Sequence, residues 1–145
     1  MLFRSQYAIG DLVANSTTAG SVVPMSFAVA RATGKGGMIR KMRLRISNTS
    51  ITAASFRLHL YSVSPTPSNG DNGAWLTNQA ANYVGSLDVT NDKVFTDGSS
   101  GNGGPNTGSE VNFTSDTLYG LLEARDTYTP TSGGTLTVEL EVLQN

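Results

Sequence analysis

Three segments of the chain alternate strictly between apolar and polar residues. Because side chains alternate between the two faces of a β-strand, such a segment can bury one face and expose the other. The pattern therefore predicts strands that lay an apolar face on a core. The three segments are Met42-Arg43-Leu44-Arg45-Ile46, Phe56-Arg57-Leu58-His59-Leu60 and Leu136-Thr137-Val138-Glu139-Leu140-Glu141-Val142.

Shorter stretches of the same kind predict further strands, and runs of Gly, Pro, Asn and Ser separate them. We expect the strands near 38–47 and 55–63 to form a hairpin. No segment has the periodicity of an amphipathic helix. About eight short strands in a chain of this size indicate an all-β fold, a two-sheet antiparallel β-sandwich of jelly-roll type. The weaker strands are expected at 23–29, 83–89, 94–95, 111–113 and 118–125.

A length of 145 residues favours one domain with its own core. Residues 1–20 are weakly patterned, and we interpret them as an extended N-terminal arm. Residues 21–145 then form a single β-sandwich domain. Within it, residues 97–109 are rich in Gly, Ser and Asn, which predicts a flexible loop that buries nothing.

Composition excludes several classes of function. The net charge is −1 and charged residues make up 14% of the chain, so a nucleic-acid partner is not expected. The absence of cysteine excludes disulfides, thiolate nucleophiles and Cys-ligated zinc. No segment approaches the ~20 apolar residues that cross a bilayer, and the first residues do not resemble a signal peptide. We expect a protein made in the cytoplasm, with no membrane partner.

The residues that could carry catalysis form no recognisable motif. His59 is the single histidine, and the alternation places it on the exposed face of its strand, without a Gly-x-Ser-x-Gly nucleophile motif nearby. Glu139 and Glu141 lie two apart on one strand face, a spacing of about 6–7 Å that exposed strands carry routinely. Glu110 and Glu123 have no evident partner. We expect no enzyme activity and no catalytic residue.

Metal and phosphate sites have weak support. A single histidine is too few for a histidine-based metal site. The Gly-rich segment lacks the Gly-Lys-Ser/Thr ending of a phosphate-binding loop. Calcium needs only oxygen ligands, which loops supply here, although Asp and Asn are also turn residues. We expect no cofactor and no metal, and leave calcium open. The loop residues concerned are Asp71, Asn72, Asp92 and Asp97.

Two groups of residues are candidates for binding a partner. Trp75, with Tyr61, Tyr83 and Tyr128, could stack sugars, or Trp75 could cover the open end of the sandwich. The second group is a basic stripe. It either pairs with Glu139 and Glu141 on a neighbouring strand or faces an acidic surface on a partner. The stripe consists of Lys41, Arg43, Arg45 and Arg57.

The order of several segments resembles the small capsid decoration (cement) proteins of tailed bacteriophages. The similarity spans roughly residues 38–143. The segments are Phe56-Arg57-Leu58-His59-Leu60-Tyr61, Pro65, Asp71-Asn72-Gly73-Ala74-Trp75, Tyr83-Val84-Gly85, Leu118-Tyr119-Gly120-Leu121-Leu122-Glu123-Ala124-Arg125 and Tyr128-Thr129-Pro130.

The resemblance implies a jelly-roll structural protein of the virion, without enzyme activity, on the head surface. Its partner would be the major capsid protein, whose subunits it would bridge to stabilise the shell, and it would act as a dimer or trimer of this chain. Residues 1–20 and 97–109 have no counterpart in the resemblance, and we expect them to make contacts. The alternative is a receptor- or carbohydrate-binding module of a tail fibre or baseplate.

Overall fold

The structure is a computed structural model, and it describes residues 6–47, 54–107 and 110–145. These residues form ten antiparallel strands and two short 3-10 turns, η1 (Ala19–Ser21) and η2 (Ala80–Asn82). The all-β prediction is confirmed, with ten strands in the described residues where about eight are predicted. The strands are β1 (Leu12–Val13), β2 (Met25–Ala28), β3 (Gly37–Ile46), β4 (Ala54–Tyr61), β5 (Tyr83–Asn91), β6 (Lys93–Phe95), β7 (Gly98–Pro105), β8 (Val111–Phe113), β9 (Thr117–Ala124) and β10 (Leu136–Gln144).

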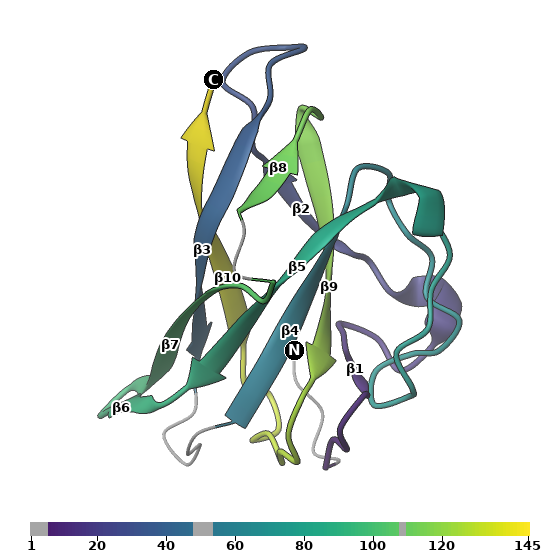
Figure 1. Cartoon of the computed structure of the whole chain (residues 1–145). Helices are drawn as coiled ribbons and strands as arrows, with labels where there is room; N and C mark the ends of the chain where they lie inside the picture. Colours follow the sequence, from purple (N-terminus) through teal and green to yellow (C-terminus); the bar gives the residue numbers. More distant parts are fainter. Residues whose placement is uncertain (1–5, 48–53, 108–109) are drawn as a thin grey trace.

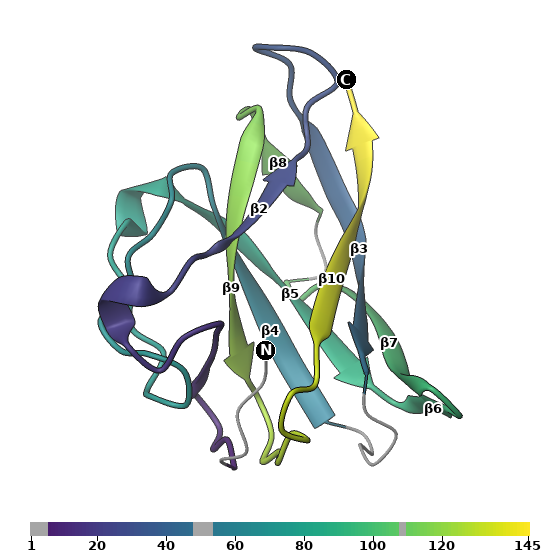
Figure 2. The same cartoon turned by 180° about the vertical axis from the view of Figure 1, so that it is seen from behind.

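The strands belong to one hydrogen-bonded sheet in the order β1-β9-β4-β5-β7-β3-β10. Strand β2 also pairs with β9, β6 with β7, and β8 with β3. The sheet curls, so that β3 and β10 lie on one side of the molecule and β4 and β9 on the other (Figures 1 and 2). Neither 3-10 turn, nor any other helix in the described ranges, is long and apolar enough to cross a membrane.

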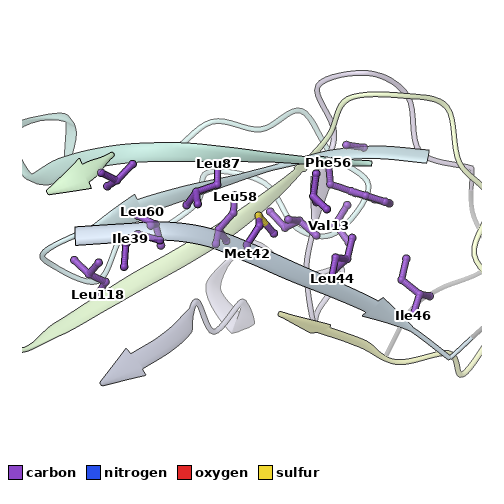
Figure 3. Packing of buried hydrophobic residues seen from close by; sticks show 14 of the residues in the cluster. Val13, Ile39, Met42, Leu44, Ile46, Phe56, Leu58, Leu60, Leu87 and Leu118 are labelled. Carbon is purple, nitrogen blue, oxygen red and sulfur yellow. The ribbon is translucent and has the colours of Figure 1, made fainter. Parts of the chain in front are cut away.

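The core lies inside this curl and is built from the apolar positions of the alternating segments. Met42 and Leu44 of β3, and Phe56 and Leu58 of β4, have no exposed surface. Figure 3 shows Met42 and Leu58 pointing toward one another from the two strands. Burying these side chains removes apolar surface from water, at ~25 cal/mol for each Å².

The predicted hairpin between the strands near 38–47 and 55–63 is wrong. Strands β3 and β4 are separated in the sheet by β5 and β7, and they meet across the core instead. Alternation predicts that each strand buries one face. The pattern is the same whether two strands are neighbours in a sheet or face each other across the core, so it does not predict which strands pair. The turn expected at 48–52 lies outside the described residues.

The predicted flexible loop at 97–109 is wrong for most of its length. Residues 98–105 form β7, which pairs with β3 on one edge and with β5 and β6 on the other. A Cβ at Gly103 would overlap the carbonyl oxygen of Asp88, so glycine allows the strands to approach closely. Gly-rich composition is here a packing requirement. Residues 108 and 109 are outside the described ranges.

The part of the predicted N-terminal arm that the structure describes packs against the sheet. Leu12 and Val13 form β1 and pair with Glu123 and Leu122 of β9. Tyr7 forms a bridge with Tyr128 and has no exposed surface. The first 3-10 turn follows at Ala19–Ser21. Backbone pairing and apolar burial thus hold residues 7–13 to the sheet.

The outer face of the sheet is covered in one half and bare in the other. On β4 and β9, the outward side chains of Tyr61 and Leu121 are 1% and 3% exposed. The connection between β4 and β5, residues 62–82, lies beside this face (Figure 1). On β3 and β10, the outward positions are exposed. The candidate site lies in the covered half.

Candidate functional site

His59 is buried, contrary to the predicted exposed position. It points outward from β4 as the alternation requires, yet it is only 7% exposed. The ring of Trp75, from the connection between β4 and β5, stacks on the imidazole with a centroid distance of 4.0 Å and an interplanar angle of 26°. Trp75 therefore covers the outer face of the sheet and not an open end. The prediction failed because it treated every outward position as solvated.

Both ring nitrogens of His59 have hydrogen-bond partners. Nε2 lies 2.7 Å from Oε2 of Glu123 on β9, and Nδ1 lies 3.0 Å from the hydroxyl of Tyr83 on β5. A carboxylate only accepts, so Nε2 carries the proton and Nδ1 accepts from the Tyr83 hydroxyl. Arg125 donates to the other oxygen of Glu123 at 3.0 Å. We call His59, Trp75, Tyr83 and Glu123 the outer network.

The imidazole of the outer network is held neutral. Burial lowers the pKa of His59 below its ordinary value of 6.5; Glu123 raises this pKa, and Arg57 and Arg125 lower it further. The order of hydroxyl, imidazole and carboxylate matches a nucleophile, its base and an orienting acid. An imidazole with a lowered pKa is a poor acceptor for the proton of a phenol, whose ordinary pKa is about 10. The network is therefore suited to positioning the rings of Trp75 and Tyr83.

A pocket of about 350 Å³ opens beside this network. Tyr61 and Tyr83 meet edge to face in its wall, with centroids 5.3 Å apart. Three of the four predicted aromatic residues are thus brought together, while Tyr128 packs elsewhere, against Tyr7 and Phe56. The lining residues are His59, Tyr61, Trp75, Thr77, Asn78, Ala80 and Tyr83.

The basic stripe is largely neutralised by partners within the chain. Lys41 Nζ lies 3.0 Å from Glu141 Oε2, and Arg43 Nε donates to Glu139 at 2.7 Å. The register of β3 and β10 places these residues opposite each other, which confirms the predicted internal pairing for both. A contact of this stripe with a partner protein stays a prediction.

The other two residues of the stripe behave differently. Arg57 pairs with Asp88 of β5 at 2.6 Å, and neither Glu139 nor Glu141 is its partner. Arg45 lies opposite Thr137 of β10 and Ser100 of β7. In the described ranges, Arg45 has no ion pair.

The loop residues considered as calcium ligands do not form a group of three carboxylates in the described residues. Asp71 is 7% exposed, and its Oδ1 accepts from the Tyr7 hydroxyl and the Ala14 N–H, each at 2.7 Å. Burial raises the pKa of Asp71, because desolvation disfavours the charged carboxylate. Within residues 6–47, 54–107 and 110–145, no three His, Cys, Asp or Glu side chains are grouped as metal ligands. Asp71 fastens the N-terminal residues to the connection between β4 and β5.

Sequence reasoning missed Glu123 as the partner of His59. The signal was present at the outward positions of the two strands. Tyr61 and Leu121 are apolar or aromatic where a solvated face would carry polar residues. An apolar residue at both positions indicates that a further layer covers this face. His59, which lies directly opposite Leu121 and two residues before Tyr61, then needs hydrogen-bond partners, because an unpaired buried polar group is costly.

Comparisons with known proteins give no match: no protein-family model, no curated protein and no solved structure matches this chain.

Proposed function

We propose that this protein is a decoration, or cement, protein of a tailed-phage head. It binds the outside of the shell, bridges subunits of the major capsid protein and acts as an oligomer of this chain. The curled sheet is then a jelly-roll type of β-sandwich, the fold that the sequence resemblance implies. The observation that carries the proposal is the presence of exposed apolar side chains at two separate ends of the molecule, which one continuous sheet connects.

One end is the hairpin formed by β6 and β7. Val94 and Phe95 of β6 are 49% and 56% exposed. Figure 1 shows β6 at the lower left extremity of the molecule, away from the core. Because consecutive residues of a strand point to opposite faces, the projecting hairpin exposes one apolar side chain on each of its faces, and each is available for contact with a partner.

The other end is formed by the segment between η1 and β2, which carries Val23, and by the connection between β4 and β5, which carries Leu76. Val23 and Leu76 are 70% and 58% exposed, and both segments lie at the right of Figure 1, across the molecule from β6. A protein that bridges two capsid subunits needs contact surfaces that are separated and held at a fixed distance. A hydrogen-bonded sheet between the two ends supplies that stiffness.

Charge contributes less to this contact than apolar area does. Lys41 and Arg43 are already paired with Glu141 and Glu139, so an acidic partner would have to compete with those carboxylates. Each apolar contact is small and weak alone. Many copies bound to a symmetric shell nevertheless attach firmly, because the contacts are multivalent.

The proposal is tested by mixing the purified protein with undecorated phage heads, before and after expansion, and measuring co-sedimentation and extra cryo-EM density. We expect symmetric density on the outer surface that bridges capsid subunits. Phe95→Ser is expected to weaken attachment by about tenfold, as for a buried aromatic anchor. Leu143→Ala is the matched control, since Leu143 is 50% exposed at another place, and it should bind normally. Protein that stays unbound at both stages contradicts the proposal.

A further inference from the structure

We propose that the pocket beside Trp75 binds the ring of a neutral sugar, a hexose or an N-acetylhexosamine. This inference goes beyond attachment to a head and does not rest on it, because the pocket residues differ from Val23, Leu76, Val94 and Phe95. The pocket volume of about 350 Å³ falls in the range of small-molecule sites, roughly 300–1,000 Å³.

The aromatic walls of the pocket suit the apolar face of a pyranose. The C–H groups on that face pack on the electron-rich face of an aromatic ring. Stacking on His59 fixes the plane of the Trp75 ring, and the edge-to-face contact with Tyr61 fixes that of Tyr83. Rings that are already fixed lose little entropy when a ligand packs against them.

Two polar side chains of the lining retain hydrogen-bonding groups for the edge of a sugar. Asn78 Oδ1 accepts from the Thr66 N–H at 2.8 Å, so its Nδ2 amide supplies the donors. Thr77 Oγ1 donates to the Thr66 carbonyl at 3.1 Å, so its lone pairs can accept. A donor beside an acceptor is the arrangement that neighbouring hydroxyl groups recognise.

The segment carrying these two residues is held in place before any ligand arrives. Thr77 forms a β-bridge with Pro67. Gln79, which follows Asn78, adopts a left-handed conformation with φ 70°, and its side-chain oxygen accepts from Asn82 at 2.7 Å. Such a conformation costs energy for a residue other than glycine and is found preferentially at functional sites. Its position beside Asn78 fits a binding role.

The electrostatics of the pocket favour a neutral ligand. The seven described residues of its lining include no Asp, Glu, Lys or Arg. His59 has a lowered pKa and is neutral at pH 7. Both carboxylate oxygens of Glu123 already accept hydrogen bonds, one from His59 and the other from Arg125. An anionic sugar or a phosphate would find no counter-charge in the lining, and a quaternary ammonium would have no free carboxylate there.

Trp75 is the only tryptophan, so its fluorescence reports directly on the pocket. The full-length protein is titrated with oligosaccharides of glucose, galactose, mannose and N-acetylglucosamine, and separately with choline and a proline-rich peptide. We expect a saturable change in emission with at least one neutral sugar and none with the other two. Tyr83→Ala should weaken binding by about tenfold, the value of one lost aromatic contact.

Asn78→Asp is the sharper variant, because it keeps the oxygen that accepts from Thr66 and removes the amide donors. We expect a loss of sugar affinity of about tenfold with an unchanged urea midpoint. Leu143→Ala is the control and should bind sugar like the natural chain. On a glycan array, Trp75→Ala should lose the signal that the natural protein gives.

Three outcomes overturn the inference. The first is the absence of any response to the neutral sugars in both fluorescence and array. The second is a response to choline or to the peptide alone, which would identify a cation or polyproline site instead. The third is sugar binding that Trp75→Ala and Asn78→Asp leave unchanged while both variants remain folded, because the sugar would then bind elsewhere.

Discussion

The outer face of each half of the sheet carries a pair formed by a basic residue and a glutamate on neighbouring strands, but the two pairs differ in how far they are buried. On β4 and β9, His59 and Glu123 pair across the strands, and their side chains are 9% and 10% exposed. On β3 and β10, Arg43 and Glu139 pair directly opposite each other, whereas His59 reaches Glu123 diagonally, and the side chains of Arg43 and Glu139 are 50% and 46% exposed. A cross-strand pair therefore does not reveal from its own sequence whether it will be buried. A distant segment, residues 62–82, makes the difference.

Burial changes what each pair contributes to stability. In water, the attraction between opposite charges is weak and is offset by the entropy of holding two long side chains. In the covered half, the carboxylate of Glu123 is 10% exposed, so it has lost most of its water and depends on His59 and Arg125 for hydrogen bonds. Removing one partner there leaves the other without solvation, which is costly. The two halves should respond very differently to matched substitutions.

The largest effect is expected from Glu123→Ala in the covered half. His59 Nε2 loses its acceptor, Arg125 loses its carboxylate, and a cavity forms beneath residues 62–82. We expect the free energy of unfolding to fall by about 3 kcal/mol, because a buried N–H is left unpaired and a cavity forms, measured by urea denaturation at pH 7.5.

Glu123→Gln separates charge from hydrogen bonding in this test. It retains an oxygen that accepts from His59, so the loss should be smaller than for Glu123→Ala. Equal losses for the two variants would show that the charge of Glu123, and not its hydrogen bond, is what matters. A loss below about 1 kcal/mol for Glu123→Ala is the value typical of exposed pairs and would contradict the comparison.

The join between the two halves is tested by Gly103→Ala. Strand β7 links β5 to β3, and an added Cβ at Gly103 would overlap the Asp88 carbonyl, forcing the strands apart. We expect a loss of about 2 to 3 kcal/mol in the same denaturation assay. Gly104→Ala is the control, because the nearest atom to its Cβ would be the Arg40 carbonyl oxygen at 3.4 Å. Equal effects would mean that close approach is not the reason for glycine here.

The sequence predicts the inner face of the sheet well and its outer face poorly. Met42, Leu44, Phe56 and Leu58 are buried as alternation requires, because one face of an amphipathic strand must meet a core. Alternation carries no information on what lies over the opposite face. The burial of His59 depends on Trp75, which follows it by sixteen positions through a connection without regular strands.

The glycine strand was missed for a related reason. Residues 98–105 contain no alternating apolar side chains, so they give no periodic signal. Their place in the sheet comes from backbone hydrogen bonds on both edges and from the close approach of Asp88. Both are properties of the neighbouring strands. The aromatic pocket could be predicted as a set of residues, but the exclusion of Tyr128 required the fold.

The pH dependence of stability offers a measurement confined to the covered half. The pKa of His59 is lowered in the folded chain, so the unfolded chain takes up the proton first as the pH falls. Stability is therefore complete above pH 6.5 and declines below it until the folded imidazole is also protonated. Since this is the only histidine, its ring signals give the folded pKa by NMR titration. Trp75→Ala should move that pKa upward, because it removes part of the burial.

The contribution of Asp71 to the pH dependence of stability has the opposite sign. Its pKa is raised by burial, so its contribution grows as the pH falls through that raised value toward 3.8, the ordinary value. A His59→Gln variant isolates the contribution of the histidine, and its stability should change less than that of the natural chain as the pH falls below the ordinary histidine pKa of about 6.5. A folded His59 that titrates at or above 6.5 would contradict the network as described.

The smallest effect is expected from Glu139→Ala in the bare half, which is the counterpart of Glu123→Ala. Arg43 then loses its carboxylate but remains solvated, since half of its side chain is exposed. We expect a loss below about 1 kcal/mol, and one that shrinks further as salt is raised. The loss in Glu123→Ala should change little with salt, because ions screen buried pairs less. A salt-independent loss of several kcal/mol in Glu139→Ala would mean that the outer face of β3 and β10 is also covered. A second copy of the chain could cover it, so the measurement is repeated over a range of protein concentrations.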